Sequence, residues 1–168
     1  MSGTELNSET IVNNSVFIVP DANLFTFGII SSAAHMAWLH AIGGRIKSDY
    51  RYASDLVYNT FPWPDRAALT PRQVKAVEEA ARQVLEAREK HPGSTLAQLY
   101  DPLTMPRALR DAHNALDRAV DALYGLKAGS TEAQRLALLL THYQQLAPTL
   151  ESQARPTKTR RKGTGVLT

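Results

Sequence analysis

The sequence predicts a predominantly helical protein, in which an α+β N-terminal portion precedes a small all-α helical domain. In the first portion we expect a few short strands packed on one buried helix. Three observations support this fold class. Residues 24–42 are apolar and uncharged, residues 45–64 are rich in aromatic side chains, and residues 65–147 repeat apolar side chains at helical spacing. With 168 residues, 43% of them hydrophobic, the chain is long enough to bury a core.

The first portion centres on one long apolar segment. Residues 15–19 (SVFIV) predict a short strand that ends at Pro20. Residues 24–42 carry no formal charge and are apolar on every face, which predicts one buried helix ended by Gly43. A membrane span of this length is the alternative, but the flanks lack an aromatic belt and a strong positive bias. The buried helix is therefore the preferred prediction.

A boundary follows the aromatic segment at residues 45–64. Its tyrosine, valine and phenylalanine side chains favour extended structure. Pro62 and Pro64 end that segment, because proline cannot take an ordinary position in a strand ladder. The predicted division has four parts: a loose N-terminus (1–10), an α+β portion (11–64), a helical domain (65–147) and a basic flexible tail (148–168).

The second half of the chain contains several helix signals. Thr70 and Gln73 form a capping box with Pro71 at the first helical position, and apolar residues recur from there to about Lys90. The other predicted helices are a short piece after Ser94, a helix from Thr104 or Met105 to Gly125, and a helix from Ser130 or Thr131 with Leu136, Leu139, Leu140 and Tyr143 facing inward.

The net charge of +3 is unevenly distributed. Residues 1–64 have a net charge of −2, residues 65–147 of +1 and residues 148–168 of +4. The tail could add sequence-independent attraction to phosphate, although a solubilising end is the simpler interpretation. Its cations are Arg155, Lys158, Arg160, Arg161 and Lys162.

Several kinds of chemistry are absent from the sequence. Without cysteine, the chain has no disulfide scaffold, thiolate zinc site or cysteine nucleophile. It has no glycine-rich phosphate loop and no G-x-S-x-G elbow. His35 and His40 lie about 140° apart on a helix, so we expect packing or a local hydrogen bond rather than a shared metal. We predict no catalytic, cofactor-binding or metal-ligating residue, and a cytoplasmic location because no signal peptide is visible.

One short segment has the composition of a nucleic-acid contact. It interleaves cations with phenols directly after the apolar helix. Cations supply phosphate contacts, and serine and tyrosine hydroxyls can donate or accept at sugar and base edges. A solvated basic loop is the alternative interpretation. The candidate DNA-binding residues are Arg45, Lys47, Ser48, Tyr50, Arg51 and Tyr52.

Four strings in this order have a recognisable counterpart. They are FGIISSAAHMAWLHAIGG, GRIKSDYRYASDLVYNTFPWP, STLAQLYDPLTMP and RALRDAHNALDRAVDALYG. Together they resemble the C-terminal end of MmeI-like (type IIL) restriction–modification enzymes and related adenine-specific DNA methyltransferases, over about residues 15–147.

The resemblance implies two pieces of a larger enzyme. Residues up to Pro64 resemble the last part of a target-recognition domain, and those from Asp65 resemble the helical C-terminal domain. In the intact family, a separate domain transfers methyl from S-adenosyl-L-methionine to adenine N6 of double-stranded DNA, and some members add a nuclease. The family's Asn/Asp-Pro-Pro-Tyr/Phe motif is absent here, so no catalytic or cofactor residue is carried over. Phe61 and Trp63 are expected at the joint between the two pieces.

The functional prediction is a DNA-recognition and bracing part that acts with an upstream methyltransferase polypeptide. The 24–42 helix has too few predicted strands around it to be covered, which suggests that a partner surface is missing. The alternative function is a free-standing helical interaction module, without a role on DNA, that grips a partner with the exposed face of this helix.

Overall fold

The computed structural model describes the backbone of residues 18–46 and 49–154, and the side chains of these residues except 45, 46, 49 and 147–154. The described part of the chain is mostly helical. In chain order its elements are α1 (Leu24–Ile30), α2 (Ala33–Ile42), β1 (Gly44–Ile46), β2 (Asp49–Arg51), the π-helical turn η1 (Ser54–Tyr58), α3 (Pro71–Glu89), α4 (Leu96–Leu99), α5 (Arg107–Leu123) and α6 (Glu132–Ala154).

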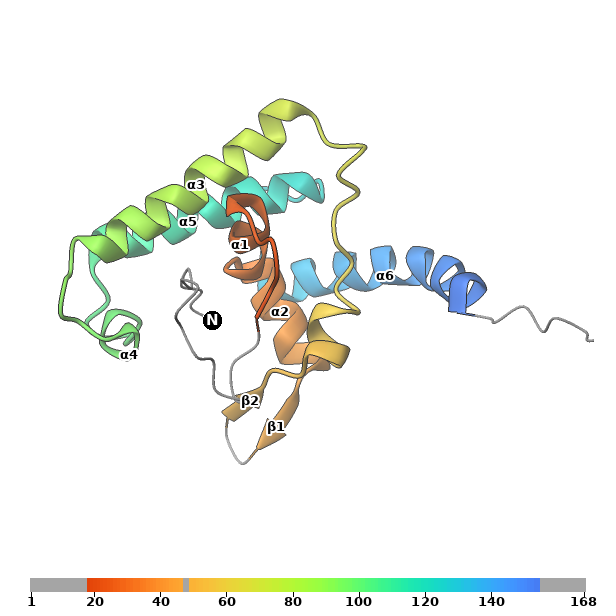
Figure 1. Cartoon of the computed structure of the whole chain (residues 1–168), viewed down its shortest axis with the longest axis horizontal. Helices are drawn as coiled ribbons and strands as arrows, with labels where there is room; N and C mark the ends of the chain where they lie inside the picture. The colour runs from red at the N-terminus through yellow and green to blue at the C-terminus, as the bar shows by residue number, and fades with distance from the viewer. Residues whose placement is uncertain (1–17, 47–48, 155–168) are drawn as a thin grey trace, which may run out of the picture.

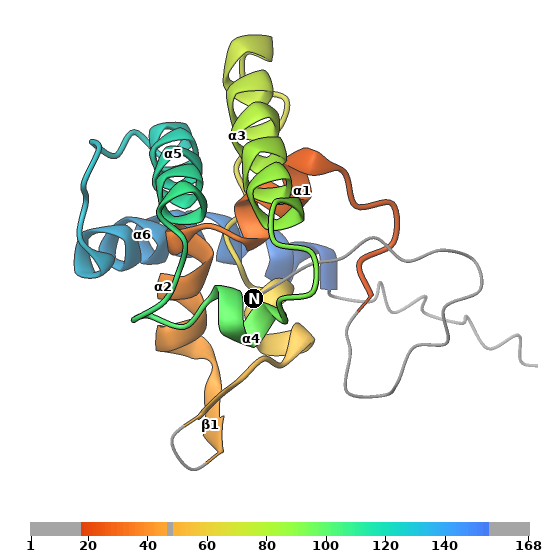
Figure 2. The same cartoon turned by 90° about the vertical axis from the view of Figure 1, so that its left-hand side faces the viewer.

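A pair of long helices forms the upper layer of the molecule. α3 and α5 lie side by side along their lengths, and α1 crosses beneath them (Figures 1 and 2). The crossing is close at Gly28, where an added Cβ would lie 2.8 Å from Val77 Cγ1 and 3.2 Å from Leu116 Cδ1. Only a residue without a side chain lets the three helices approach this closely. α2 continues downward to the hairpin, and α6 packs across it.

The apolar segment forms two helices rather than the single helix predicted. α1 ends at Ser31, α2 begins after Ser32, and their axes differ by 51°. Ser32 caps α2, and the Asp117 carboxylate on α5 accepts a hydrogen bond from the Ala33 N–H at 2.7 Å. Among the described residues, no single helix is long and apolar enough to span a membrane. α1 and α2 together have this length and composition, but only as a bent pair.

The expectation that the apolar segment lacks cover is wrong. α1 packs against α3 and α5, and α2 packs against α6, so the C-terminal helices enclose what the few strands could not. Ile29 and Trp38 are at most 1% exposed. The buried side chains of the two helices share one core with those of α3, α5 and α6. The apolar composition of residues 24–42 is therefore explained by the chain's own helices and does not indicate a missing partner.

Strand structure is more limited than the aromatic composition predicted. β1 and β2 form a two-stranded antiparallel hairpin, but residues 54–58, expected to be extended, form the π-helical turn. Val57 is buried in the common core, which explains its apolar character without a strand. Ile18 and Val19 are not in a strand, and the rest of the strand predicted at 15–19 lies outside the described residues.

The helical half agrees closely with its sequence signals, with three exceptions. The Thr70–Gln73 capping box is present and α3 ends at Glu89. The short helix is capped by Thr95, one residue after the predicted Ser94. Leu140 is 38% exposed rather than inward. α6 continues through Pro148 to Ala154, although proline has no N–H to donate to the Gln144 carbonyl oxygen; the cations of the predicted tail lie outside the described residues.

Candidate nucleic-acid interface

The hairpin that follows α2 carries the predicted DNA-binding residues. Its register pairs Gly44 with Arg51, Arg45 with Tyr50 and Ile46 with Asp49. It extends from the lower end of α2, away from the α3–α5 layer (Figure 1). At its base, an added Cβ on Gly43 would lie 2.5 Å from the Leu39 carbonyl oxygen, so glycine is needed for the tight passage from helix to strand.

The candidate residues differ in their surroundings. The Arg51 side chain is exposed, and Tyr50 is 38% exposed. The backbone of Arg45 lies in β1. Lys47 and Ser48, predicted to contact DNA, lie outside the described residues.

Tyr50 rests on a histidine from α2. The His40 and Tyr50 rings are stacked, with centroids 4.2 Å apart and planes inclined by 21°. His40 Nδ1 in turn lies 2.9 Å from Glu132 Oε1 at the start of α6. Residues 92 positions apart are thus brought together at the base of the hairpin.

Tyr52 is held inward by a buried histidine. Its hydroxyl lies 3.1 Å from His35 Nε2, and the His35 side chain is fully buried. Burial lowers the pKa of His35 to about 4 and raises the pKa of Tyr52 to about 12, so both side chains are neutral at pH 7. His35 Nδ1 is buried without a hydrogen bond. This favours the tautomer with the proton on Nε2, since an unpaired lone pair costs less than an unpaired N–H.

Phe61 and Trp63 lie between the hairpin segment and the helices. The Phe61 ring is buried and makes edge contacts with Trp38 and Tyr124. Trp63 packs edge-on against Phe61, and its Nε1–H donates to the Tyr58 carbonyl oxygen at 3.3 Å. These rings fix the path of the chain from η1 toward α3.

Two carboxylates on α5 connect the other helices. Asp117 holds the N-terminus of α2, as described above. Asp121 is 1% exposed and forms a two-pronged ion pair with Arg135 of α6, with both N–O distances 2.8 Å. Hydrogen bonding to Asp121 raises the pKa of Arg135, while burial raises the pKa of Asp117. Each carboxylate thus has a partner inside the protein: a backbone N–H donor for Asp117 and a guanidinium counter-ion for Asp121.

A second polar cluster joins α3, α4 and α5. Arg88 Nε and one of its terminal nitrogens donate to the Tyr100 hydroxyl at 2.8 and 2.6 Å, and that hydroxyl lies 2.7 Å from His113 Nε2. Burial lowers the pKa of His113 to about 4, so its ring is neutral and accepts the Tyr100 proton at Nε2. The chain of donors runs from guanidinium to phenol to imidazole. We interpret this cluster as structural, because it holds the short helix α4 against α3 and α5.

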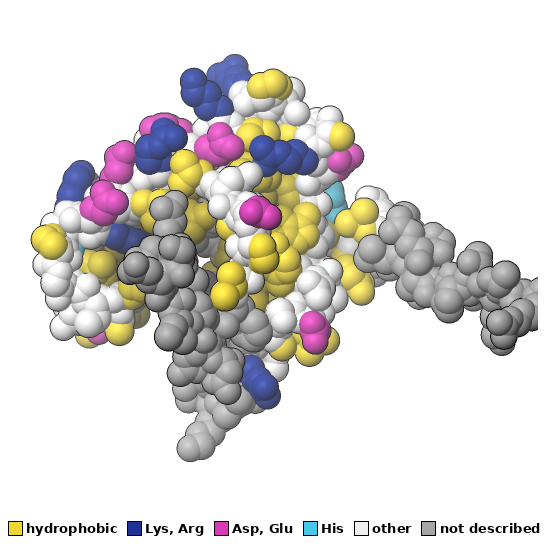
Figure 3. All heavy atoms as spheres, in the orientation of Figure 1, with side chains coloured by type: hydrophobic (Ala, Val, Ile, Leu, Met, Phe, Trp, Pro, Cys, Tyr) yellow, Lys and Arg dark blue, Asp and Glu magenta, His cyan; other side chains and the backbone are white. Residues whose placement is uncertain are grey.

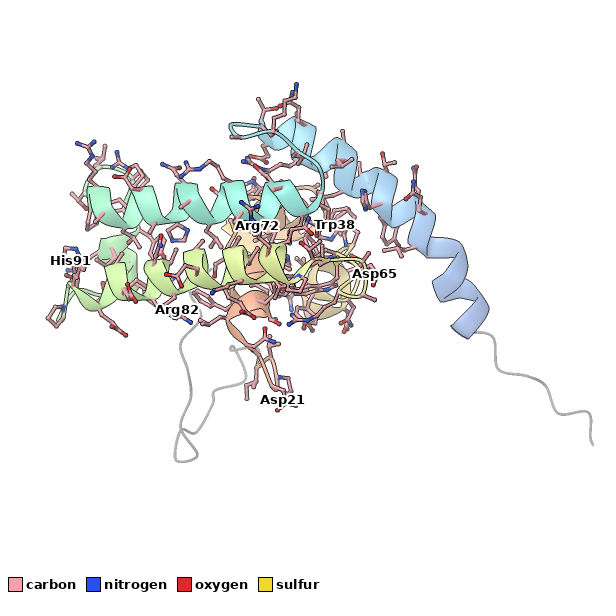
Figure 4. The ribbon with its side chains drawn as sticks, turned by 90° about the horizontal axis from the view of Figure 1, so that it is seen from above. Asp21, Trp38, Asp65, Arg72, Arg82 and His91 are labelled. Atoms are coloured by element: carbon pink, nitrogen blue, oxygen red, sulfur yellow. The ribbon has the colours of Figure 1, made fainter. Side chains whose placement is uncertain are left out.

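The described residues show no group of metal ligands, and they form a groove on the surface beside α3. Across residues 18–46 and 49–154, no three His, Cys, Asp or Glu side chains gather as metal ligands would. A surface groove of about 560 Å³ lies beside the first half of α3. Figure 4, which views the molecule from above, labels Arg72 and Arg82 on this helix and His91 beyond its far end. The groove's lining includes Arg66, Lys75, Glu79 and Arg82, which are all exposed.

The molecular surface adds a second feature. The face drawn in Figure 3 shows hydrophobic side chains over its centre, bordered above by the mixed charges of α3. The positive and negative side chains alternate along that border, and Arg82 is paired with Glu79 at 2.7 Å. This border is therefore not a continuous basic stripe on the face drawn.

Comparison with known proteins identifies the class to which this architecture belongs. Residues 3–65 match the family model of the MmeI target recognition domain, and residues 69–151 match that of the MmeI C-terminal domain. The chain therefore belongs to the MmeI family of DNA methyltransferase and restriction–modification proteins, and it carries these two domains in this order.

Two individual relatives define the likeness more closely. The chain is 42% identical to DNA methyltransferase A of Bacillus subtilis (strain 168) over 139 residues, which is 83% of this chain and 15% of the relative. It superimposes with a TM-score of 0.72 on the type IIL restriction–modification enzyme MmeI solved in complex with DNA, at 47% identity, covering 77% of this chain and 17% of that chain. The chain thus spans less than a fifth of either relative.

Proposed function

We propose that this chain is the DNA-recognition and bracing part of an S-adenosyl-L-methionine-dependent, adenine-specific (N6) DNA methyltransferase of a restriction–modification system. The hairpin β1–β2 holds double-stranded DNA, and the helices support it. The observation that carries the proposal is the projection of this basic hairpin from the body, inside the segment that matches a target recognition domain.

The hairpin residues divide the work of contact and support. Arg51, with its exposed guanidinium, contacts phosphate together with Arg45 and Lys47, and Ser48 adds a polar contact. Tyr50 packs against sugar or base from its place on His40. The Tyr52 hydroxyl meets His35 inside the protein, so we now assign Tyr52 to the base of the hairpin rather than to DNA.

Methyl transfer belongs to another part of the enzyme. S-adenosyl-L-methionine supplies the methyl group when it is bound, but the described residues do not fit it. The groove beside α3 is lined by long, exposed charged side chains, whereas nucleotide-like cofactors bind at a glycine turn that follows a strand. The contribution of this chain is to hold and orient DNA beside an upstream methyltransferase polypeptide. A cytoplasmic location belongs to the same proposal.

The alternative of a free-standing interaction module has lost its main support. It required an exposed face on the 24–42 segment. Phe25, Ile29, Trp38 and Leu39 of that segment are instead buried among the chain's own helices.

The substitution Arg51→Ala tests the DNA contact directly. The 168-residue chain should bind mixed-sequence duplexes more weakly after this change, regardless of sequence, and the salt slope of log K should become shallower by about 0.9. Fluorescence anisotropy across a salt series measures both. Arg107→Ala, at a guanidinium 93% exposed on α5, is the matched control and should leave the slope unchanged. Equal losses in the two variants would remove Arg51 from the interface.

A further inference from the structure

We propose that Glu132, in the C-terminal domain, is a positioning residue for the DNA-contacting hairpin, acting through His40 and Tyr50. This inference rests on the proposed function of the hairpin. It adds a specific link: the carboxylate that starts α6 fixes an imidazole, and the imidazole supports the phenol that faces DNA.

The start of α6 is well fixed. The Thr131 N–H donates to Gln134 Oε1 at 2.8 Å, and the Gln134 N–H donates to Thr131 Oγ1 at 3.3 Å. This reciprocal cap holds the first helical turn, in which Glu132 lies. The Asp121–Arg135 ion pair then ties the same turn to α5. Glu132 is therefore presented from a rigid point of the molecule.

The hairpin, at the other end of this link, is less stable than the start of α6. β1 and β2 have three residues each and pair only with one another in the described structure. A two-stranded hairpin of this size is marginally stable alone in water. The stacked His40–Tyr50 pair gives it an aromatic support on α2, and the 2.9 Å contact of His40 Nδ1 with Glu132 Oε1 sets the orientation of that imidazole. Loss of the carboxylate should loosen the hairpin without unfolding the body, since the Glu132 side chain is 61% exposed.

The sign of the effect separates positioning from simple electrostatics. Glu132 is an anion close to the proposed DNA site. If it acted only through its charge, its removal would strengthen DNA binding by reducing repulsion. A positioning role predicts the opposite, because a mobile hairpin must be ordered before its cations meet phosphate. The two mechanisms therefore predict opposite changes for one substitution.

Amide hydrogen exchange of the 168-residue chain tests the link without DNA. Glu132→Ala should accelerate exchange at residues 44–51 while exchange in α3 and α5 stays unchanged. Glu132→Gln keeps a hydrogen-bond acceptor for His40 and should largely restore protection. His40→Phe keeps a ring for stacking but loses the bond to Glu132, so it should loosen the hairpin as Glu132→Ala does. Unchanged exchange at 44–51 in both Glu132→Ala and His40→Phe would overturn the proposal.

Duplex binding by the same variants supplies the second readout. Glu132→Ala should raise the Kd about two- to five-fold, the range expected from loss of one exposed pair. Glu132→Gln should remain near wild type, and combining Glu132→Ala with His40→Phe should add no further loss. The matched control is Glu79→Ala, which removes a comparably exposed carboxylate, 50% against 61%, from α3. Tighter binding by Glu132→Ala, or an equal loss in Glu79→Ala, would contradict positioning. Failure of the proposed function looks different: Arg51→Ala would then leave binding unchanged.

Discussion

His35 and His113 are two histidines that the fold keeps neutral. His35 of α2 contacts the Tyr52 hydroxyl. His113 accepts a hydrogen bond from Tyr100, which Arg88 also contacts. Burial lowers the pKa of each imidazole to about 4. These side chains therefore act as uncharged hydrogen-bonding groups, His35 in the core and His113 at a half-buried position, and burial disfavours protonation of either one.

Stability should consequently fall as the solution becomes acidic. The unfolded chain takes up protons at each histidine near pH 6.5, whereas the folded chain resists until about pH 4. The free energy of unfolding is thus greatest above pH 6.5 and should fall between pH 6.5 and 4, by at most about 1.4 kcal/mol per pH unit for each histidine. Asp117, whose pKa is raised by burial, opposes this trend at the acidic end.

Urea titrations at pH 7.5, 6.0 and 5.0 measure this dependence. His113→Gln removes one titrating group and keeps an acceptor for Tyr100, so its unfolding free energy should vary about half as steeply with pH. A wild-type unfolding free energy that is constant from pH 7.5 to 5.0 would contradict the account.

At the scale of elements, the close crossing of α1 with α3 and α5 depends on Gly28. In a free helix, exchanging glycine for alanine is favourable by about 1 kcal/mol. At Gly28 the new Cβ would lie 2.8 Å from Val77 Cγ1 and 3.3 Å from Ala81 Cβ. Packing and helix propensity therefore act in opposite directions at this position, and the buried contact should dominate.

Gly28→Ala should lower the free energy of unfolding by about 1–3 kcal/mol, the usual cost of overpacking a core. Chemical denaturation followed by circular dichroism measures this. Val77→Ala removes the Cγ1 that obstructs the new methyl group. The double variant Gly28→Ala, Val77→Ala should therefore be more stable than the sum of the two single losses predicts. A more stable Gly28→Ala single variant would show that the crossing has room to spare.

The elements also show what local sequence can and cannot predict. The capping box at Thr70 and Gln73 lies within four residues, so α3 could be located from the sequence. The break between α1 and α2 could not, because one of the bonds that starts α2 comes from Asp117, 84 residues away. Residues 54–58 were expected to be extended, yet they form a helical turn in which Val57 is the buried side chain.

The candidate site divides in the same way. Segment 45–52 stood out because its cations and phenols are adjacent in sequence. The missed residues are His40 and Glu132. For His40 the sequence predicted packing or a local hydrogen bond, and Glu132 gives no signal because the contact between them spans 92 residues. Tyr52 belongs to the predicted segment, but the structure turns its hydroxyl toward His35.

On the scale of the whole molecule, the two family segments interlock. Trp38 packs against Tyr143 of α6, and the Tyr124 hydroxyl donates to the Pro62 carbonyl oxygen at 3.0 Å. Asp121 and Arg135 join the two C-terminal helices on which α2 rests. This arrangement supports the proposed bracing function, since the hairpin is attached to a body formed by both segments.

Asp121→Ala should be among the most destabilising single changes. It leaves the Arg135 guanidinium without its two-pronged carboxylate in a position that is 12% exposed. Removing one partner of such a buried pair costs about 3–5 kcal/mol. Thermal unfolding, read by tryptophan fluorescence and by circular dichroism, should shift together to lower temperature. Asp111→Ala, at an exposed carboxylate on the same helix, is the control and should change stability little. A melting temperature equal to wild type for Asp121→Ala would show that this ion pair does not hold α5 and α6 together.

The salt dependence of duplex binding tests whether the hairpin cations Arg45, Lys47 and Arg51 hold the phosphates of double-stranded DNA. The slope of log K against log salt concentration should be shallower by about 2.7 in the triple alanine variant than in the wild type, because three phosphate contacts are lost. Identical slopes for the two proteins would contradict the claim and place the DNA contact elsewhere.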